Sequence, residues 1–315
     1  MRIAITGASG FVGTHLTQRL EFEGHELVLI SRRQRIDDAR AAATDLADVS
    51  VLRELFRGCK VVAHCAGINR DTGNQTYRRV HVEGTRNVVE AAKAAGVEKI
   101  VLTSFLRARA NCGSPYHESK WEAEEIVRNS GLDYTIVKAG VVYGLGDHML
   151  DHLSHALHTF PIFALVGLKE KSIRPLAVED LVHVMRGAMI DRRMKRQTIA
   201  VTGPEEIYLS EAVRRVAEVV GKRPLMFPLP VVCHKLMAHI FELTMKVPLT
   251  SLAQVRILSE GFVDAGTPVS PLPYDLVPTR RFTAEQIRPA LVFLATKKIN
   301  HKKAHKAQRE TMDQA

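Results

Sequence analysis

Cysteine is scarce in this 315-residue chain, and its four cysteines lie far apart, without a CxxC pair or a histidine at zinc-ligand spacing. The sequence therefore argues against a zinc site, and a reducing compartment is the simpler interpretation. No run reaches the ~18 uninterrupted apolar residues of a spanning helix. The N-terminus begins in a strand-like run instead of a signal sequence. We expect a cytoplasmic protein, with peripheral contact to a membrane as the alternative.

Positive charge is in modest excess over most of the chain. Lys and Arg number 44 against 34 Asp and Glu, which gives a formal charge of +10. The tail from Lys297 to Ala315 holds six basic and two acidic residues, so the other residues share only +6. The tail has too few apolar residues to pack and lacks the interleaved aromatics of nucleic-acid-binding segments. We expect a disordered, solvated tail and no nucleic-acid partner.

Strand-like runs alternate with segments of helical periodicity over the first half of the chain. This alternation is typical of βαβ units and predicts an α/β fold with a doubly wound parallel sheet of the Rossmann type. The expected strands are Arg2–Thr6, Glu26–Ser31, Lys60–His64, Lys99–Thr103 and Tyr134–Lys138. The expected helices between and after them are Gly10–Phe22, Leu52–Arg57, Tyr77–Ala95 and Tyr116–Asn129.

The pattern loosens after about residue 147, which divides the chain. We predict a dinucleotide-binding domain over residues 1–147, to which residues 172–203 return with a helix and a strand. Residues 148–171 and 204–296 are expected to form a smaller C-terminal lobe for a substrate or partner, because the later stretch combines prolines with long apolar runs. Residues 297–315 are the basic tail.

A glycine loop, Gly7-Ala8-Ser9-Gly10-Phe11-Val12-Gly13, follows the first strand and opens the first helix. Binding a dinucleotide requires this context, because the chain must turn tightly, approach the pyrophosphate closely and offer free N–H groups at a helix N-terminus. The loop therefore predicts dinucleotide binding. The expected contacts are Gly7, Ser9, Gly10, Phe11, Val12 and Gly13.

Further motifs follow the glycine loop in order: Asp45-Leu46, His64-Cys65-Ala66-Gly67, Val82-Glu83-Gly84-Thr85-Arg86-Asn87 and Val142-Tyr143-Gly144. With the GxxGxxG spacing, they make the chain resemble the extended short-chain dehydrogenase/reductase superfamily from Met1 to about Val220. The resemblance implies that the Asp45-Leu46 pair contacts the adenine. It also implies that Cys65, Ala66 and Gly67 lie beneath the cofactor.

The end of the second strand indicates which nicotinamide cofactor is bound. An acidic side chain there would accept the ribose hydroxyls of NAD and repel a 2′-phosphate. The strand instead ends with Ser31-Arg32-Arg33, and the guanidinium groups of Arg32 and Arg33 can bind that phosphate bidentately. The sequence favours NADP(H) over NAD(H), unless these arginines point to solvent.

Tyr116 and Lys120 are four residues apart, on one face of a predicted helix. A lysine ammonium lowers the pKa of a nearby phenol, so that Tyr116 could exchange a proton near neutral pH. At this position the resemblance implies the catalytic pair of the family. Ser104 is the predicted third member, although the family more often places the hydroxyl where Phe105 stands. Alternatively, Ser104 satisfies backbone groups at the strand end.

Tyr116 follows Ser104 by only twelve positions, and the segment between them ends in Ser114-Pro115. This short step resembles one atypical branch, which contains the nucleotide-binding accessory subunit of respiratory complex I and its bacterial relatives. The chain departs from extended members of the superfamily at His81, where asparagine is usual, and at Ala139, where proline is usual.

Two features of the C-terminal half have more than one interpretation. His148, His152, His155 and His158 would share one face of a helix; we expect a polar face near a substrate cleft rather than a metal site. A later apolar stripe would pack in the core of the lobe, rest on an anionic membrane or contact a lipid-like substrate. Its members are Val232, Cys233, Leu236, Met237, Ile240, Phe241, Thr244 and Val247.

The sequence thus predicts an NAD(P)(H)-binding protein, most simply an oxidoreductase that transfers hydride between NADP(H) and a hydroxyl or carbonyl substrate. One alternative is a non-catalytic nucleotide-binding accessory or assembly module of a respiratory complex or membrane. A second alternative is a nucleotide-sugar epimerase or dehydratase, although the loop before Tyr116 is short for one.

Overall fold

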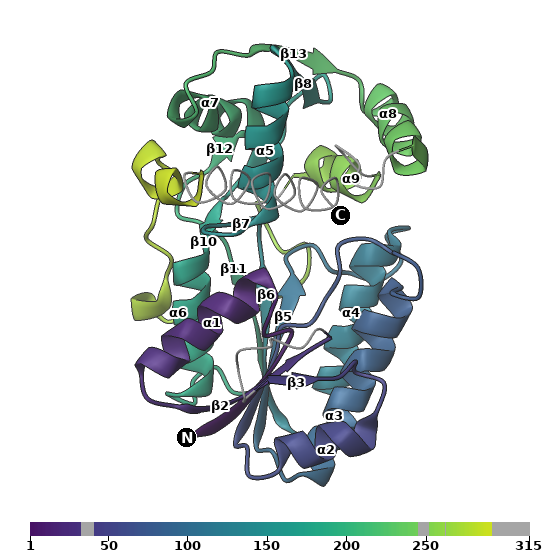
Figure 1. Cartoon of the computed structure of the whole chain (residues 1–315), viewed down its shortest axis with the longest axis vertical. Helices are drawn as coiled ribbons and strands as arrows, with labels where there is room; N and C mark the ends of the chain where they lie inside the picture. The colour runs from purple at the N-terminus through teal and green to yellow at the C-terminus, as the bar shows by residue number, and fades with distance from the viewer. Residues whose placement is uncertain (33–40, 245–251, 262, 292–315) are drawn as a thin grey trace, which may run out of the picture.

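A seven-stranded sheet forms the centre of the protein in a computed structural model that describes residues 1–32, 41–244, 252–261 and 263–291 (Figure 1). The strand order is β11-β6-β5-β4-β1-β2-β3, and all neighbouring strands are parallel. The strands are β1 (Arg2–Thr6), β2 (Glu26–Ser31), β3 (Ala41–Ala43), β4 (Val61–His64), β5 (Lys99–Phe105), β6 (Asp133–Ala139) and β11 (Gln197–Val201). The order reverses between β1 and β4, where such sheets bind ligands. The predicted α/β fold with a doubly wound parallel sheet is confirmed.

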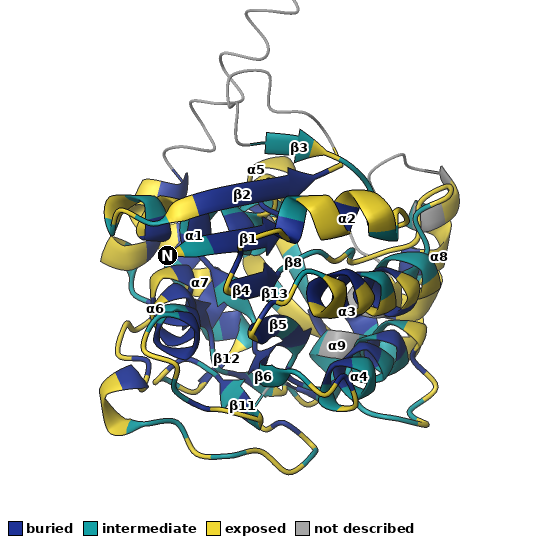
Figure 2. Cartoon of the chain, turned by 90° about the horizontal axis from the view of Figure 1, so that it is seen from below, coloured by how far each residue is buried: buried dark blue, intermediate teal, exposed yellow. Residues whose placement is uncertain are grey.

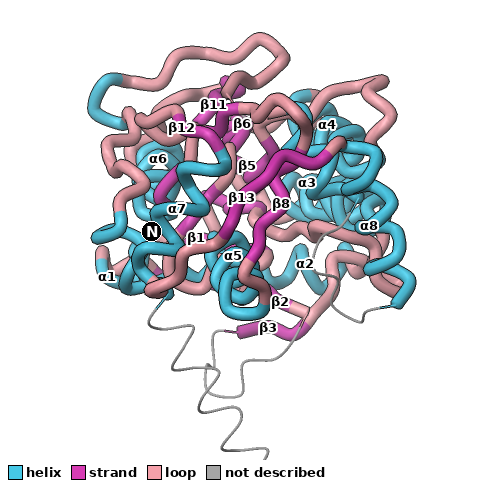
Figure 3. Tube along the Cα trace, turned by 90° about the horizontal axis from the view of Figure 1, so that it is seen from above, coloured by secondary structure: helices cyan, strands magenta, loops and turns pink. Residues whose placement is uncertain are grey.

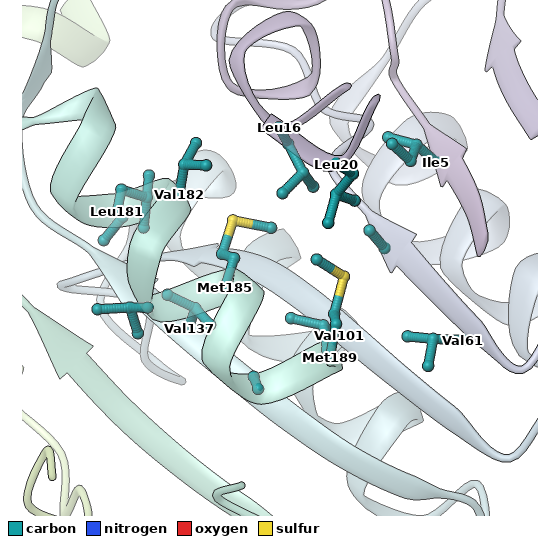
Figure 4. Packing of buried hydrophobic residues seen from close by; sticks show 14 of the residues in the cluster. Ile5, Leu16, Leu20, Val61, Val101, Val137, Leu181, Val182, Met185 and Met189 are labelled. Atoms are coloured by element: carbon teal, nitrogen blue, oxygen red, sulfur yellow. The ribbon is translucent and has the colours of Figure 1, made fainter. Parts of the chain in front are cut away.

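Helices cover both faces of the sheet, which is why its strands are apolar throughout rather than alternating. On β1, Ile3 and Ile5 pack under α1 (Phe11–Phe22) and α6 (Val178–Met189), whereas Ala4 faces the opposite core. Helices α2 (Val49–Phe56), α3 (Gly84–Ala94) and α4 (Pro115–Arg128) cover that second face. Figure 4 shows the first core, where methionines of α6 meet leucines of α1 over the strands. In Figure 2 the central strands carry the dark blue of buried residues.

The helix expected over Tyr77–Ala95 is divided in two. A π-helical segment, η1 (Arg78–Glu83), precedes α3. In a π-helical turn each hydrogen bond spans five residues instead of the four of an α-helix, and such turns often lie at functional sites. Here it positions His81, which is buried beside α4.

The smaller lobe lies above the sheet in Figure 1, with a two-stranded ribbon at its far side. In this ribbon β8 (Ile162–Val166) pairs in parallel with β13 (Leu225–Leu229) (Figure 3). The helices of the lobe are α5 (His148–Thr159), α7 (Leu209–Val219), α8 (Val231–Thr244) and α9 (Leu252–Glu260). Short elements connect lobe and sheet: β7 (Val142–Tyr143), β9 (Ser172–Ile173), β10 (Leu176–Ala177), β12 (Ile207–Tyr208) and η2 (Tyr274–Leu276).

Residues 172–203 contribute to both regions. Their strand β11 pairs with β6 at the edge of the sheet, and α6 packs against α1, whereas β9 pairs with β12. The predicted tail over residues 297–315 lies outside the described residues. Within the described ranges, no helix combines the length and the apolar character needed to cross a membrane.

Candidate cofactor and active site

The glycine loop between β1 and α1 has no room for side chains at two of its positions. Gly7 has a φ of +71°, and a Cβ atom there would lie 2.6 Å from the backbone nitrogen of Ala66. A Cβ atom on Gly13 would overlap the carbonyl oxygen of Gly7. Gly10 precedes the first residue of α1 and has no side chain that could occupy the first N–H groups. The loop therefore fits a pyrophosphate held by backbone N–H groups at a helix N-terminus.

Two cavities meet at this loop and share Gly10, Cys65, Gly67 and Ile68 in their walls. The first has a volume of about 180 Å³ and extends over the carboxyl end of β2. The second has a volume of about 870 Å³ and extends from the loop into the smaller lobe. An extended dinucleotide laid across the loop would place its adenosine half in the first cavity and its nicotinamide half in the second.

The predicted adenine contacts, Asp45 and Leu46, line the first cavity and are held by residues distant in sequence. Asp45 Oδ2 lies 2.8 Å from Nη2 of Arg79, and Asp45 Oδ1 accepts a hydrogen bond from the Ala47 N–H. Asn87 donates its side-chain N–H to the Leu46 carbonyl at 2.7 Å. Arg79 and Asn87 also line this cavity. Neither was predicted as a site residue, because no local spacing links them to residues 34 and 41 positions earlier.

The end of β2 brings one of the two predicted phosphate ligands to the first cavity. Arg32 is exposed and lines this cavity beside Ser31. Arg33 lies outside the described residues. The preference for the 2′-phosphate form of the cofactor therefore stays a prediction.

Tyr116 and Lys120 lie on α4, and both line the second cavity together with Gly10 and Gly13. Aromatic rings surround the phenol: the ring centroid of Phe105 is 5.3 Å away and that of Tyr77 is 5.6 Å away. Burial, with a smaller contribution from Tyr77, raises the pKa of Tyr116 well above its ordinary value. Burial lowers the pKa of Lys120 to about 8, against the opposing effects of Cys65 and Glu124. In the protein without a bound cofactor, the raised pKa keeps the Tyr116 phenol protonated at neutral pH.

Gly67 allows the Lys120 amine to approach the backbone after β4. A Cβ atom on Gly67 would lie 3.0 Å from Lys120 Nζ and 3.5 Å from Nε2 of His81. A side chain at this position would therefore push the Lys120 amine aside, whereas its contact with His81 would be an ordinary one. The predicted contacts Cys65 and Ala66 precede it, and both line the first cavity.

His81 links the loop after β4 to the catalytic helix. Its Nε2 accepts a hydrogen bond from the Ile68 N–H at 3.1 Å, so the ring proton is on Nδ1, which donates to Ser119 Oγ at 2.9 Å. The Ser119 hydroxyl in turn donates to the Tyr116 carbonyl. Burial, followed by repulsion from Lys120, lowers the pKa of His81 to about 2. A neutral histidine thus replaces the usual asparagine, in direct contact with α4.

Ser104 lies in the wall of the second cavity, but its hydroxyl is engaged elsewhere. It donates to Glu124 Oε1 at 2.6 Å. Glu124 is completely buried and also binds Arg128 Nη2 at 2.7 Å and Lys138 Nζ at 3.2 Å. The sequence offered backbone groups at the strand end as the alternative partners of Ser104, and the structure instead shows the Glu124 carboxylate. To donate to a substrate, the hydroxyl would have to turn away from Glu124, so this role stays a prediction.

Phe105 occupies the position where the family more often has the hydroxyl. Its ring stacks on His117 with centroids 5.2 Å apart and packs against Tyr116. The departure noted in the sequence therefore gives an apolar wall beside the phenol.

The four histidines of α5 do not act as one group. His152 lines the second cavity, whereas His155 and His158 are exposed, and their rings bond within α5 to the Thr159 hydroxyl and the Ser154 carbonyl. The side chain of His148 is outside the described set. In the described part of the chain, no three His, Cys, Asp or Glu side chains lie close enough to hold a metal ion.

The apolar stripe on α8 is divided between two sides. Met237 and Phe241 line the second cavity, whereas Leu236 and Ile240 are exposed on the other side of the helix. Val247 lies outside the described residues. One side of α8 therefore faces the cavity inside the lobe, and the other side is exposed, so the stripe does not pack wholly in a core.

A parallel sheet, a glycine loop at its reversal point and a Tyr/Lys pair facing the same cavity define an NAD(P)-binding protein with the fold of extended short-chain dehydrogenases/reductases and epimerases. Residues 7–145 match the family model for NAD(P)H-binding domains. This part of the chain is therefore an NAD(P)-binding domain, and the predicted resemblance is confirmed.

The curated relatives of the chain have several functions. An uncharacterized protein of Mycobacterium tuberculosis is 26% identical over 81% of this chain, which spans only about 27% of that longer protein. Ceramide reductase of Caulobacter vibrioides is 27% identical over 72% of this chain and 73% of its own length. Subunit 9 of the mitochondrial NADH dehydrogenase [ubiquinone] 1 alpha subcomplex of Mus musculus is 25% identical over 80% of this chain and 70% of its own.

Solved structures share the fold. UDP-glucuronic acid 4-epimerase from Bacillus cereus, in complex with UDP-glucuronic acid and NAD, superposes with a TM-score of 0.69 at 18% identity and covers 94% of this chain and 99% of that one. At this identity the likeness concerns the fold alone.

Proposed function

We propose that the protein is an NADP(H)-dependent oxidoreductase that acts on a hydroxyl or carbonyl substrate. The observation that carries this proposal is that Tyr116 and Lys120 line the same cavity as Gly10 and Gly13 of the pyrophosphate loop. When bound, the cofactor supplies or accepts the hydride. The name of the Caulobacter relative, ceramide reductase, also supports an oxidoreductase.

The residues of this chain supply the proton and the positions of the reacting groups. The Tyr116 hydroxyl gives its proton to the carbonyl oxygen in reduction and takes it back in oxidation. Because burial raises the pKa of Tyr116, the phenol needs a nearby positive charge to ionise. The Lys120 ammonium provides that charge, and Ser104 orients the substrate oxygen once its hydroxyl turns from Glu124.

The walls of the second cavity favour an oxidoreductase over a nucleotide-sugar epimerase. A nucleoside diphosphate is usually bound by several arginine or lysine side chains. Among the described residues that line this cavity, Lys120 is the one Lys or Arg side chain, and it lies at the inner end. The remaining wall is mainly apolar, which is unsuited to a diphosphate.

The test is NADPH oxidation with a panel of ketones and aldehydes, followed by the Tyr116→Phe variant. We expect turnover to fall at least about a hundredfold in Tyr116→Phe, the usual contribution of a general acid. Tyr274→Phe, at an exposed tyrosine that does not line the cavity, is the control and should keep full activity. Unchanged turnover in Tyr116→Phe would overturn the mechanism.

A second candidate is a non-catalytic accessory or assembly module, which would retain the nucleotide as a structural or redox-sensing ligand. The engagement of Ser104 by Glu124 and the similarity to the mouse respiratory-complex subunit favour it. The exposed apolar side of α8 would then contact a respiratory complex or a membrane. Cofactor that survives purification but reacts with no member of the panel would support this candidate. A protein found outside membrane fractions and not bound to anionic vesicles would count against it.

A further inference from the structure

The second cavity changes character along its length. At the carboxyl edge of the sheet its wall includes the polar side chains of Asn69, Tyr116 and Lys120. In the smaller lobe the wall is mostly apolar, and its polar members are Asp147 at the start of α5, His152 on α5 and His234 on α8. Examples of its apolar members are Ala156 of α5, Ala164 of β8, Leu229 of β13, Met237 and Phe241 of α8, and Leu258 of α9.

The β8–β13 ribbon, whose two strands lie side by side in Figure 3, contributes apolar residues to the cavity wall. Because neighbouring parallel strands are in register, Ala164 lies beside Phe227 and Val166 beside Leu229, and all four side chains line the cavity. The alternate residue Met226 packs on the core of α5 and α7. Val166 also packs with α8 and α9, which close this end of the wall.

The rim of the cavity is apolar as well. Phe160, Ile162 and Phe227 line it and are nevertheless 45%, 50% and 36% exposed. Asp147, a charged residue in the wall, is engaged as the cap of α5: its carboxylate accepts hydrogen bonds from the N–H groups of Gly144 and Leu150, both at 2.7 Å. In a cavity of this size with apolar walls and an exposed apolar rim, the replacement of water by an apolar ligand is favourable, because it removes apolar surface from water.

We propose that the part of the cavity inside the smaller lobe binds the hydrocarbon chain of an amphiphilic substrate. The chain would extend between the β8–β13 ribbon, α5 and α8, and its carbonyl or hydroxyl carbon would lie at the inner end beside Tyr116. The proposal rests on the proposed function and adds the substrate class to it: a straight alkyl or acyl chain with a ketone or secondary alcohol.

Straight-chain methyl ketones from butanone to dodecanone test this proposal on the full chain with NADPH. Each methylene that enters the cavity should raise kcat/KM about fourfold until the cavity is filled. A series without chain-length dependence would overturn the chain site.

A pair of adjacent substitutions on α5 tests the location. Ala156→Phe places a ring in the cavity and should lower the dodecanone-to-butanone ratio of kcat/KM at least about tenfold. His155→Phe places the same ring one residue away on the exposed side and should keep the ratio of the unmodified protein. An unchanged ratio in Ala156→Phe would place the chain elsewhere. If Ala156→Phe does not fold, Ala164→Leu on β8 tests the same wall.

Calorimetry of the same ketones on the NADP⁺-loaded protein separates the two proposals. If the ketones are turned over with the same kcat/KM at every chain length, the chain site is overturned and the proposed function remains. Binding that strengthens with chain length, without turnover of any ketone, supports the chain site and overturns the proposed function. If the protein shows neither turnover of any ketone nor binding that depends on chain length, both proposals are overturned.

Discussion

The Ser104 hydroxyl donates a hydrogen bond to the Glu124 carboxylate across 2.6 Å. The two residues lie on β5 and α4, the elements that also carry Phe105 and Tyr116. This bond joins the predicted substrate-orienting serine to a buried ion pair with Lys138. Ser104 therefore has a structural partner of its own, whatever its role toward a substrate.

Replacing Ser104 by alanine should separate these two roles. Glu124 loses one donor but keeps Arg128 and Lys138, so the free energy of unfolding should fall by about 1.5–3 kcal/mol, the value of a hydrogen bond to a charged group. Urea denaturation measures this loss. If Ser104 also orients the substrate, kcat should fall while the affinity for NADPH is kept. An unchanged unfolding free energy would show that the bond to Glu124 contributes nothing to stability.

The stability of the fold should decrease in acid because neutral histidines are buried. Burial lowers the pKa of His64 to about 3, of His81 to about 2 and of His117 to about 4, from 6.5. Below pH 6.5 the unfolded chain binds protons that the folded chain does not, so stability present above pH 6.5 is lost as the pH falls. Each of these histidines should contribute about 1.4 kcal/mol per pH unit down to its lowered pKa.

The His81→Asn variant isolates one of these contributions. Its unfolding free energy should fall less steeply between pH 6 and pH 5, by about 1.4 kcal/mol per unit relative to the unmodified protein. His155→Asn, at an exposed position on α5, is the matched control. Identical slopes for the unmodified protein and His81→Asn would contradict the neutral, buried state of His81.

Replacing Gly67 by alanine should impair the Lys120 site. The new methyl group would lie 3.0 Å from Lys120 Nζ, so the amine must move. We expect the dissociation constant for NADPH to rise about tenfold, equivalent to ~1.4 kcal/mol. Gly140→Ala is the control, because its Cβ atom would meet Thr202 at an ordinary 3.4 Å. Equal affinities of the two variants in calorimetry would exclude a role for Gly67.

The cofactor preference rests on Arg32 and Arg33. If they bind the 2′-phosphate, NADPH should bind more tightly than NADH by about 1.5–3 kcal/mol, or roughly ten- to hundredfold. Replacing both by alanine should remove most of this preference and leave NADH binding nearly unchanged, because Gly7 and Gly13 still hold the shared pyrophosphate. Calorimetry at fixed salt decides the matter, and equal affinities in the unmodified protein would refute the assignment.

The parts of the site that lie within one continuous segment could be predicted from the sequence. The strand, turn and helix around Gly7 and Gly13 are contiguous, and the steric demand of the turn leaves glycine as the residue that fits. Tyr116 and Lys120 share a helix face because four residues make about one helical turn. Local spacing alone carries both predictions.

Only the tertiary structure decided which distant side chains meet. The contacts of Arg79 with Asp45, Ser104 with Glu124 and His81 with Ser119 join segments 20 to 38 residues apart. Such contacts depend on strand register and on how helices pack on the sheet, and neither leaves a local pattern. The same holds for the apolar cavity, whose walls come from α5, the β8–β13 ribbon, α8 and α9. The same apolar residues would suit the interior of any core, so the sequence does not show that they line a cavity beside Tyr116. Their position there follows from tertiary packing alone.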